Sequence, residues 1–262
     1  MVAGGTADAK TDVVLRPDVS FQPLNPARGN ASPQAGVLWG DLRDDVPTGA
    51  IIEFGAGFSS PPHIHNITYR AVVIEGAVHN DDPDAANMWM GPGSFWTQPA
   101  GKDHVTSAAA ETGASIFLEI LQGPYLVQPS EEAFESDEHS INLESGNIVW
   151  LEASDVTWIQ QDEGPQMAFL WGGTAANEMN GTFLKLPAGF RGELRGNGAQ
   201  IHAVTIRGEV TLDIPGQDRS ADLVPGSYFG AADDRGRRIT CKAERDCVFY
   251  IRTEGKYDLI RS

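Results

Sequence analysis

Short runs of β-branched and aromatic residues alternate with glycine- and proline-rich turns along most of this chain. In the first half they read GAIIEFGAGF, YRAVVIEGAV, SFWTQPAG and ASIFLEIL. Such runs are typical of β-strands separated by tight turns. None of them has a long period of 3.6 residues, and the acidic segment SEEAFESDE is compatible with either a short helix or a loop. The pattern predicts an all-β fold.

The pattern occurs twice along the chain. The segment Leu38-Trp39-Gly40 matches Leu170-Trp171-Gly172 at an offset of 132 residues. The segment PGSF, which begins at Pro92, matches PGSY, which begins at Pro225, at an offset of 133 residues. Residues 56–58 and 71–76 also match residues 188–190 and 203–208. A single added residue is a loop insertion, so the sequence predicts two halves of the same architecture.

Three histidines of the first half lie in two motifs, GFSSPPHIH, which ends at His65, and GSFWTQPAGKDH, which ends at His104. His63 and His65 are two residues apart, so on a strand their side chains point to the same face. Neutral imidazole is a common protein ligand of Zn, Fe, Mn and Cu. Three protein ligands leave coordination positions open for chemistry. We therefore predict that His63, His65 and His104 bind one metal ion.

The second half keeps the turns of the repeat but not the histidines. The positions that match His63, His65 and His104 hold Arg195, Asn197 and Arg237. We expect this half to be closed by salt bridges, with an anion site as the alternative.

The two histidine motifs resemble those of the cupin superfamily, G-x5-H-x-H-x3-4-E-x6-G and G-x5-P-x-G-x2-H-x3-N. The positions in register are Gly57, His63, His65 and Gly76, and then Gly93, Pro99, Gly101 and His104. With the repeat, the chain is similar to two-barrel cupins of an uncharacterised family often labelled as dioxygenases. The resemblance implies an all-β fold of two cupin barrels in tandem, each a double-stranded β-helix or jelly roll.

The resemblance also implies a domain organisation. We expect an N-terminal arm over residues 1–33, a metal-binding cupin barrel over 34–128, a linker or strand-exchange segment over 129–165, and a degenerate cupin barrel without metal ligands over 166–262.

The sequence departs from the cupin motifs at two positions, because Tyr69 stands in the glutamate slot and Ala108 in the asparagine slot. The remaining three-histidine set resembles the Fe(II) sites of acetylacetone-cleaving and thiol dioxygenases. It implies one divalent ion per chain, with Fe(II) favoured and Zn, Mn, Ni or Cu as alternatives. Three neutral ligands leave the full charge of the ion, which favours an anionic or chelating substrate.

Other residues are candidates for supporting roles. Tyr69 is expected to act as a hydrogen-bond donor behind the metal ligands, with a weak metal ligand and a residue that only fills space as the alternatives. Phe95 is expected to line the substrate pocket, and Gln98 and Glu119 are buried polar groups that would hydrogen-bond a ligand histidine or the substrate.

The leading function is a metal-dependent enzyme, an Fe(II) dioxygenase that acts on a small organic anion. A Zn-, Mn- or Ni-dependent isomerase or hydrolase is the second enzyme class. A non-catalytic, sensor-like cupin that binds a metal or small ligand is the alternative of another kind.

The composition of the chain limits the classes of partner that it is expected to bind. A net charge of −17 argues against nucleic acids and anionic membranes as partners. The chain has no apolar run of transmembrane length and no apolar signal segment, so we expect a cytoplasmic protein. A homodimer is compatible with exposed sheet edges. The two cysteines, Cys241 and Cys247, are interpreted as small core or edge residues, without a disulfide.

Overall fold

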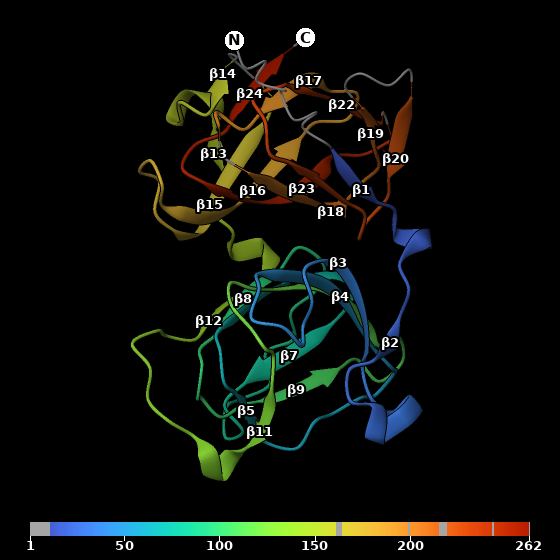
Figure 1. Cartoon of the computed structure of the whole chain (residues 1–262), viewed down its shortest axis with the longest axis vertical. Helices are drawn as coiled ribbons and strands as arrows, with labels where there is room; N and C mark the ends of the chain where they lie inside the picture. Colours follow the sequence, from blue (N-terminus) through green and yellow to red (C-terminus); the bar gives the residue numbers. More distant parts are fainter. Residues whose placement is uncertain (1–10, 161–163, 199, 215–218, 243, 262) are drawn as a thin grey trace, which may run out of the picture. The chain divides into compact units, whose positions relative to one another are not determined.

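The computed structural model describes residues 11–160, 164–198, 200–214, 219–242 and 244–261. The chain forms two compact units (Figure 1). We call residues 17–148 the N-terminal barrel, and residues 149–262 together with the segment that ends at Arg16 the C-terminal barrel. The described residues contain strands and short 3-10 turns, and none of their helices is long and apolar enough to cross a membrane.

The N-terminal barrel is built on a seven-stranded antiparallel sheet in the order β12-β8-β6-β10-β4-β3-β2. Its strands are β2 (Gln22–Pro23), β3 (Gln34–Trp39), β4 (Thr48–Phe54), β6 (Tyr69–Gly76), β8 (Phe95–Gln98), β10 (Ala114–Ile120) and β12 (Ile141–Leu143). Two strand pairs complete the barrel, formed by β5 (His63–His65) with β11 (Val127–Pro129) and by β7 (Val78–Asp81) with β9 (Val105–Ala108). Its 3-10 turns are η1 (Arg16–Asp18, which begins on the last residue of the other unit), η2 (Pro26–Ala31), η3 (Ser130–Glu132) and η4 (Ser145–Asn147).

The C-terminal barrel repeats this plan. Its seven-stranded sheet has the order β1-β21-β18-β23-β16-β15-β13, and a second sheet has the order β14-β24-β17-β22-β19-β20. The strands of the first sheet are β1 (Asp12–Val14), β13 (Leu151–Glu152), β15 (Gln166–Gly172), β16 (Met179–Leu186), β18 (Ile201–Arg207), β21 (Tyr228–Ala231) and β23 (Cys247–Glu254). The strands of the second are β14 (Ile159–Gln160), β17 (Arg191–Arg195), β19 (Val210–Asp213), β20 (Ser220–Leu223), β22 (Arg237–Cys241) and β24 (Asp258–Arg261), and η5 (Ala153–Asp155) follows β13.

The core of each barrel consists of the apolar side chains packed inside its sheets. In the N-terminal barrel, alternate residues of the large sheet, such as Ile52, Ala71 and Leu118, pack with Val78 of β7. In the C-terminal barrel the large sheet packs on the second sheet through residues such as Leu184, Phe249 and Leu212. Because side chains alternate between the two faces of a strand, the period-two pattern of the sequence becomes this buried layer.

The repeated Leu-Trp-Gly segment has a structural cause. In both barrels the register of the strand pair shifts at this segment, between Val37 and Trp39 of β3 and between Phe169 and Trp171 of β15. The bulge lays each tryptophan over a glycine of the next strand, Trp39 over Gly49 and Trp171 over Gly181, where no side chain would fit. The repeat therefore preserves a bulge and the space that its tryptophan fills.

The segments predicted as an arm and as a linker supply edge strands. From the first, whose residues 1–10 lie outside the described residues, β1 pairs with β21 and β2 pairs with β3. From the second, β12 pairs with β8, whereas β13 and β14 pair with strands of the C-terminal barrel. Added strands cover the exposed edges of sheets. The acidic SEEAFESDE segment contains one 3-10 turn, and its remaining residues are in an irregular loop.

The expectation for the cysteines was wrong, because Cys241 and Cys247 form a disulfide. The end of β22 and the start of β23 bring their Cα atoms to 5.8 Å, within the range that a disulfide spans. Both residues are fully buried, as expected for core positions. A separation of six residues in sequence does not reveal whether two strand ends meet, so the pairing depends on tertiary structure.

Candidate metal centre

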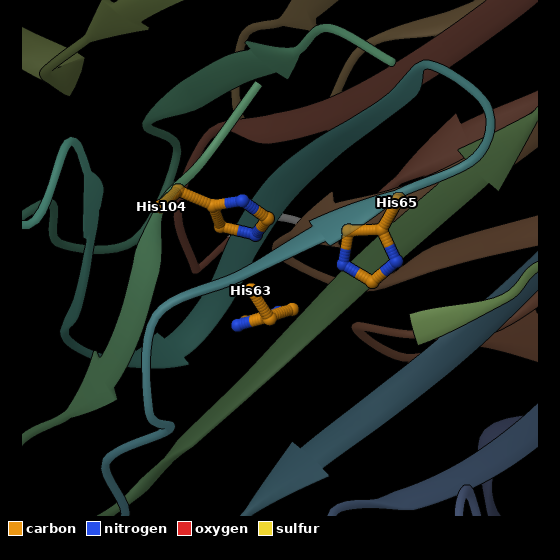
Figure 2. Close-up of side chains that lie close together, drawn as sticks. All are labelled: His63, His65 and His104. Carbon is orange, nitrogen blue, oxygen red and sulfur yellow. The ribbon is translucent and has the colours of Figure 1, made fainter. Parts of the chain in front are cut away.

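His63, His65 and His104 lie together in the N-terminal barrel (Figure 2). His63 and His65 are the ends of β5, and Ile64 between them is fully buried. His104 comes from the second motif, which is tied to the first by main-chain hydrogen bonds. The amides of His63 and His104 each donate to the other's carbonyl at 3.0 Å, and the Gly101 amide donates to the His65 carbonyl at 2.8 Å. The two motifs are therefore adjacent in space because their backbones pair.

Each imidazole is oriented by a main-chain carbonyl. The Nδ1 atoms of His63, His65 and His104 lie 2.9, 2.9 and 3.2 Å from the carbonyl oxygens of Pro61, Leu126 and Lys102. A carbonyl only accepts hydrogen bonds, so Nδ1 carries the proton and the lone pair is on Nε2. One ring nitrogen of each histidine lies within 4.8 Å of the other two. This tautomer, with Nδ1 hydrogen-bonded to a carbonyl, is typical of histidines that bind a metal through Nε2.

Burial keeps these imidazoles neutral. Loss of solvent lowers the pKa of His63 and His65, the latter well below its ordinary value, and lowers the pKa of His104 to about 3. The charges of the neighbouring histidines lower the pKa of His65 and His104 further. The neutral form is the one that binds a metal ion.

The donor set fits a divalent ion of the zinc or iron type. The Nε2 atom of His104 is buried and has no hydrogen-bond partner among the described residues. A buried polar nitrogen without a partner costs free energy, and a coordinated ion would offset that cost. Within the described part of the chain, no other group of three or more His, Cys, Asp or Glu residues is arranged to hold an ion.

A cavity of about 140 Å³ opens beside the histidines. Its walls are mainly apolar, and they include Ile52, Phe54, Phe58, Trp96, Ile116 and Leu118. His63 and His65 line it together with two tyrosines, Tyr69 and Tyr125. The segment from Leu24 to Pro33 also borders it and contributes Arg28, an exposed residue of η2. The cavity combines an apolar body, a cluster of nitrogen ligands and one cation.

Tyr69 contacts the cluster with its ring and not with its hydroxyl group. Its ring meets the His65 ring edge-on, with centroids 5.1 Å apart. Its hydroxyl donates to Asn80 Oδ1 at 2.9 Å, and burial raises the pKa of Tyr69 to about 12. The hydroxyl thus belongs to a buried network with Asn80, Thr106 and Gln98.

Phe95, Gln98 and Glu119 are buried, but the structure does not place them in the lining of this cavity. Phe95 points to the face of β8 opposite Trp96, which does line it, because neighbouring strand residues alternate. Glu119 likewise alternates with Leu118 and lies opposite Arg70 of β6. Gln98 donates to the Lys102 carbonyl at 3.0 Å, which is the carbonyl that orients His104. Gln98 therefore contacts the carbonyl that orients His104 and does not line the cavity.

Neither Tyr125 nor Arg28 was predicted from the sequence. The Tyr125 hydroxyl lies 3.1 Å from His65 Nε2, and burial raises the pKa of Tyr125 well above its ordinary value, with Tyr69 adding to the shift. Both residues lie outside the two histidine motifs, Tyr125 in a loop and Arg28 in η2, and the motifs do not determine the course of either segment. The Asn66 side chain, directly after His65, binds the segment that carries Tyr125, but an asparagine at this position does not reveal in the sequence which segment it binds.

The C-terminal barrel holds ion pairs and amide contacts at the matching positions. Arg195 pairs with Glu193, Asn197 donates to Asp258 at 2.9 Å, and Arg237 pairs with Asp233 at 2.7 Å. Arg237 is almost fully buried. The buried Arg237–Asp233 pair agrees with the preferred expectation of a barrel closed by salt bridges, whereas the Arg195–Glu193 pair is partly exposed.

The chain matches one protein family and is similar in fold to several solved structures. A family described as "Domain of unknown function (DUF4437)" matches residues 12–260. No curated protein matches the sequence. A solved structure described as a "putative dioxygenase" from Nostoc punctiforme is similar, with a TM-score of 0.70 and 14% identity over 95% of this chain and 84% of that one.

Two further solved structures are similar over nearly the whole chain. Salicylate 1,2-dioxygenase from Pseudaminobacter salicylatoxidans gives a TM-score of 0.61 at 13% identity, covering 97% of this chain and 86% of that one. Oxalate decarboxylase from Lactobacillus farciminis gives 0.60 at 11% identity, covering 98% and 89%. At such identities the likeness concerns the fold. It confirms the predicted all-β fold of two tandem cupin barrels.

Proposed function

We propose that this chain, which belongs to the family described as "Domain of unknown function (DUF4437)", is a metal-dependent cupin enzyme. In this proposal His63, His65 and His104 hold one divalent ion, Fe(II) by preference, and the reaction is the dioxygenation of a small anionic or chelating organic molecule. One observation carries it: three neutral imidazoles, each oriented through Nδ1 by a carbonyl, lie together beside a cavity, with one ring nitrogen of each within 4.8 Å of the other two.

The residues around the cluster have separate tasks. The three carbonyl acceptors hold the imidazoles in the tautomer whose lone pair is on Nε2. The apolar walls exclude water and bind the body of the substrate. Arg28 attracts and orients an anionic group at the border of the cavity. A bound iron ion supplies the redox chemistry with O2, which protein side chains do not provide.

The solved relatives support a choice of test compounds. They include an enzyme named for salicylate and another named for oxalate, which are both small carboxylates. The Arg28 guanidinium and a cation held by neutral ligands would each attract such molecules.

Turnover of the Fe(II)-loaded protein tests this function. O2 consumption and CO2 release are followed with a panel of salicylate, oxalate, β-diketones, thiols and flavonols. Loss of O2 with one compound, abolished in His104→Ala, is the expected result. Product formation without O2 loss would instead favour an isomerase, hydrolase or decarboxylase. Binding of a compound with no product, for every metal tested, would favour a non-catalytic binding protein.

Assembly of the chain is a separate proposal. A homodimer would cover sheet edges that remain exposed, and sedimentation of the purified chain would test it.

A further inference from the structure

The loop after β10 brings the phenol group of Tyr125 to the histidine cluster. Tyr125 stacks on His65, with ring centroids 4.4 Å apart and an interplanar angle of 21°. Its hydroxyl lies 3.1 Å from His65 Nε2. The nitrogen it contacts is therefore the one that the proposed metal centre uses.

The protonation state of His65 determines which group donates the hydrogen bond between Tyr125 and His65. Since Nδ1 donates its proton to the Leu126 carbonyl, Nε2 has only a lone pair to offer, and Tyr125 must donate to it. A metal ion on His65 would take the same lone pair. Among the described residues, His65 Nε2 is the only hydrogen-bond partner of the Tyr125 hydroxyl, so metal binding would leave that hydroxyl without an acceptor.

The distance between the Tyr125 hydroxyl oxygen and His65 Nε2 matches that between two ligand atoms of one metal ion. With bonds of ~2.0–2.1 Å and angles between ~90° and ~110°, neighbouring donor atoms lie roughly 2.8–3.4 Å apart. The 3.1 Å between Tyr125 Oη and His65 Nε2 falls in this range. An ion held on His65 can therefore be reached by the tyrosine oxygen with little rearrangement.

The segment that carries Tyr125 is fixed by hydrogen bonds. The Asn66 side chain donates to the Pro124 carbonyl at 3.0 Å and accepts from the Leu126 amide at 2.9 Å. The Tyr125 amide donates to the Leu42 carbonyl at 2.8 Å. Because the backbone is held on both sides and the ring is stacked, the hydroxyl is pre-positioned at the cluster.

We propose that Tyr125 is the fourth protein ligand of the metal, binding through its phenolic oxygen beside His65. On binding, the O–H bond breaks, the proton passes to the buffer, and the oxygen lone pair forms the bond to the ion. The inference rests on the proposed three-histidine centre. It also gives the site an anionic ligand, in place of the glutamate whose position in the cupin motif Tyr69 occupies. One phenolate leaves the ion with a net positive charge, so a preference for anionic substrates is retained.

Spectroscopy of the iron(III) protein tests this ligand without any turnover. Purified protein is loaded with Fe(II) without air, oxidised with one equivalent of ferricyanide, and compared as wild type, Tyr125→Phe and Tyr69→Phe. A phenolate bound to iron(III) gives a visible charge-transfer band and resonance-enhanced tyrosine vibrations. We expect the band in the wild type and in Tyr69→Phe, and no band in Tyr125→Phe.

Tyr69→Phe is the matched control, because Tyr69 also contacts His65 with its ring but directs its hydroxyl to Asn80. A chelator competition adds a second readout. Tyr125→Phe should weaken metal binding by about 10-fold or more, and Tyr257→Phe, at a buried tyrosine of the C-terminal barrel, should stay near the wild type. Unfolding midpoints verify that both variants are folded.

The outcomes separate the two proposals. Wild-type protein that holds iron without the band, or a band that survives in Tyr125→Phe, would overturn Tyr125 as a ligand and leave the three-histidine centre standing. Wild-type protein that holds no metal would overturn the centre itself, and with it the proposed function.

Discussion

Gln98 and His104 share one acceptor, because Gln98 Nε2 and His104 Nδ1 lie 3.0 and 3.2 Å from the Lys102 carbonyl oxygen. Gln98 in turn accepts from Asn80, whose Oδ1 accepts from Tyr69. A chain of buried hydrogen bonds thus runs from the ring that contacts His65 to the carbonyl that orients His104. Such networks fix side chains that would otherwise choose among rotamers.

Removal of Gln98 should therefore weaken the metal site without touching a ligand. In Gln98→Leu the Lys102 carbonyl loses one of its two donors, and Asn80 loses an acceptor. We expect the metal affinity to fall about 10-fold, measured by chelator competition. Gln22→Leu, at an exposed position of β2, is the control. Equal affinities for the two variants would show that the shared carbonyl does not position His104.

Arg28 should select for anions. Within the described residues its guanidinium forms no ion pair, and it borders the cavity from η2. Titration calorimetry of the metal-loaded protein with benzoate should give a dissociation constant about 5- to 10-fold higher for Arg28→Gln. Benzamide, an uncharged analogue, should bind both proteins equally. Arg43→Gln serves as an exposed control. The same loss for benzamide and benzoate would contradict a role in charge recognition.

Acid should destabilise the metal-free protein below pH 6.5. Burial lowers the pKa of His104 to about 3 and lowers the pKa of His65 well below its ordinary value. As the pH falls through 6.5 the unfolded chain binds protons at these histidines and the folded chain does not. The free energy of unfolding therefore decreases, by up to about 1.4 kcal/mol per pH unit for each group, until the folded pKa is reached.

Urea unfolding of chelator-treated protein between pH 7 and pH 5 measures this effect. His104→Gln, which removes one such group, should have a shallower pH dependence than the wild type. His202 of the C-terminal barrel has its pKa lowered to about 3 as well, so part of the dependence should remain in the variant. Identical slopes for the two proteins would contradict the assignment of a buried neutral imidazole to His104.

The disulfide can be tested by thiol counting. Denatured protein should have no reactive thiol before reduction and two afterwards, from Cys241 and Cys247. The double variant Cys241→Ala/Cys247→Ala should lose roughly 2 kcal/mol of stability, because the bridge restricts the unfolded chain. Two thiols that react in the denatured, unreduced protein would rule out the bridge.

Local patterns were sufficient to predict the strands, the repeat and the histidine cluster. The spacing of His63 and His65 determines their common face, and the second motif carries His104 to the same place through main-chain pairing. Local patterns did not determine whether Phe95 or Trp96 faces the cavity. A strand's register decides which face is inside, and a shift of one residue exchanges the two faces.

The contributions of Tyr125 and Arg28 could not be predicted from local patterns. Tyr125 reaches His65 from 60 residues along the chain, through a loop held by Asn66. Arg28 comes from a segment before the first barrel motif. The pairing of Cys241 with Cys247 is a similar case, because it depends on how two strand ends meet. Contacts between loops depend on tertiary packing, which the alternation of apolar and polar residues along a strand does not predict.

Metal content of the purified chain tests the central claim most directly. Protein prepared without air is analysed for metals as wild type, His63→Ala, His104→Ala and His202→Ala. The last variant also removes a buried imidazole, one that contacts Tyr228 in the C-terminal barrel. We predict about one divalent ion per chain in the wild type and in His202→Ala, and almost none in the other two. Equal metal content in all four proteins, or none in the wild type after incubation with Fe(II), would contradict a three-histidine metal centre.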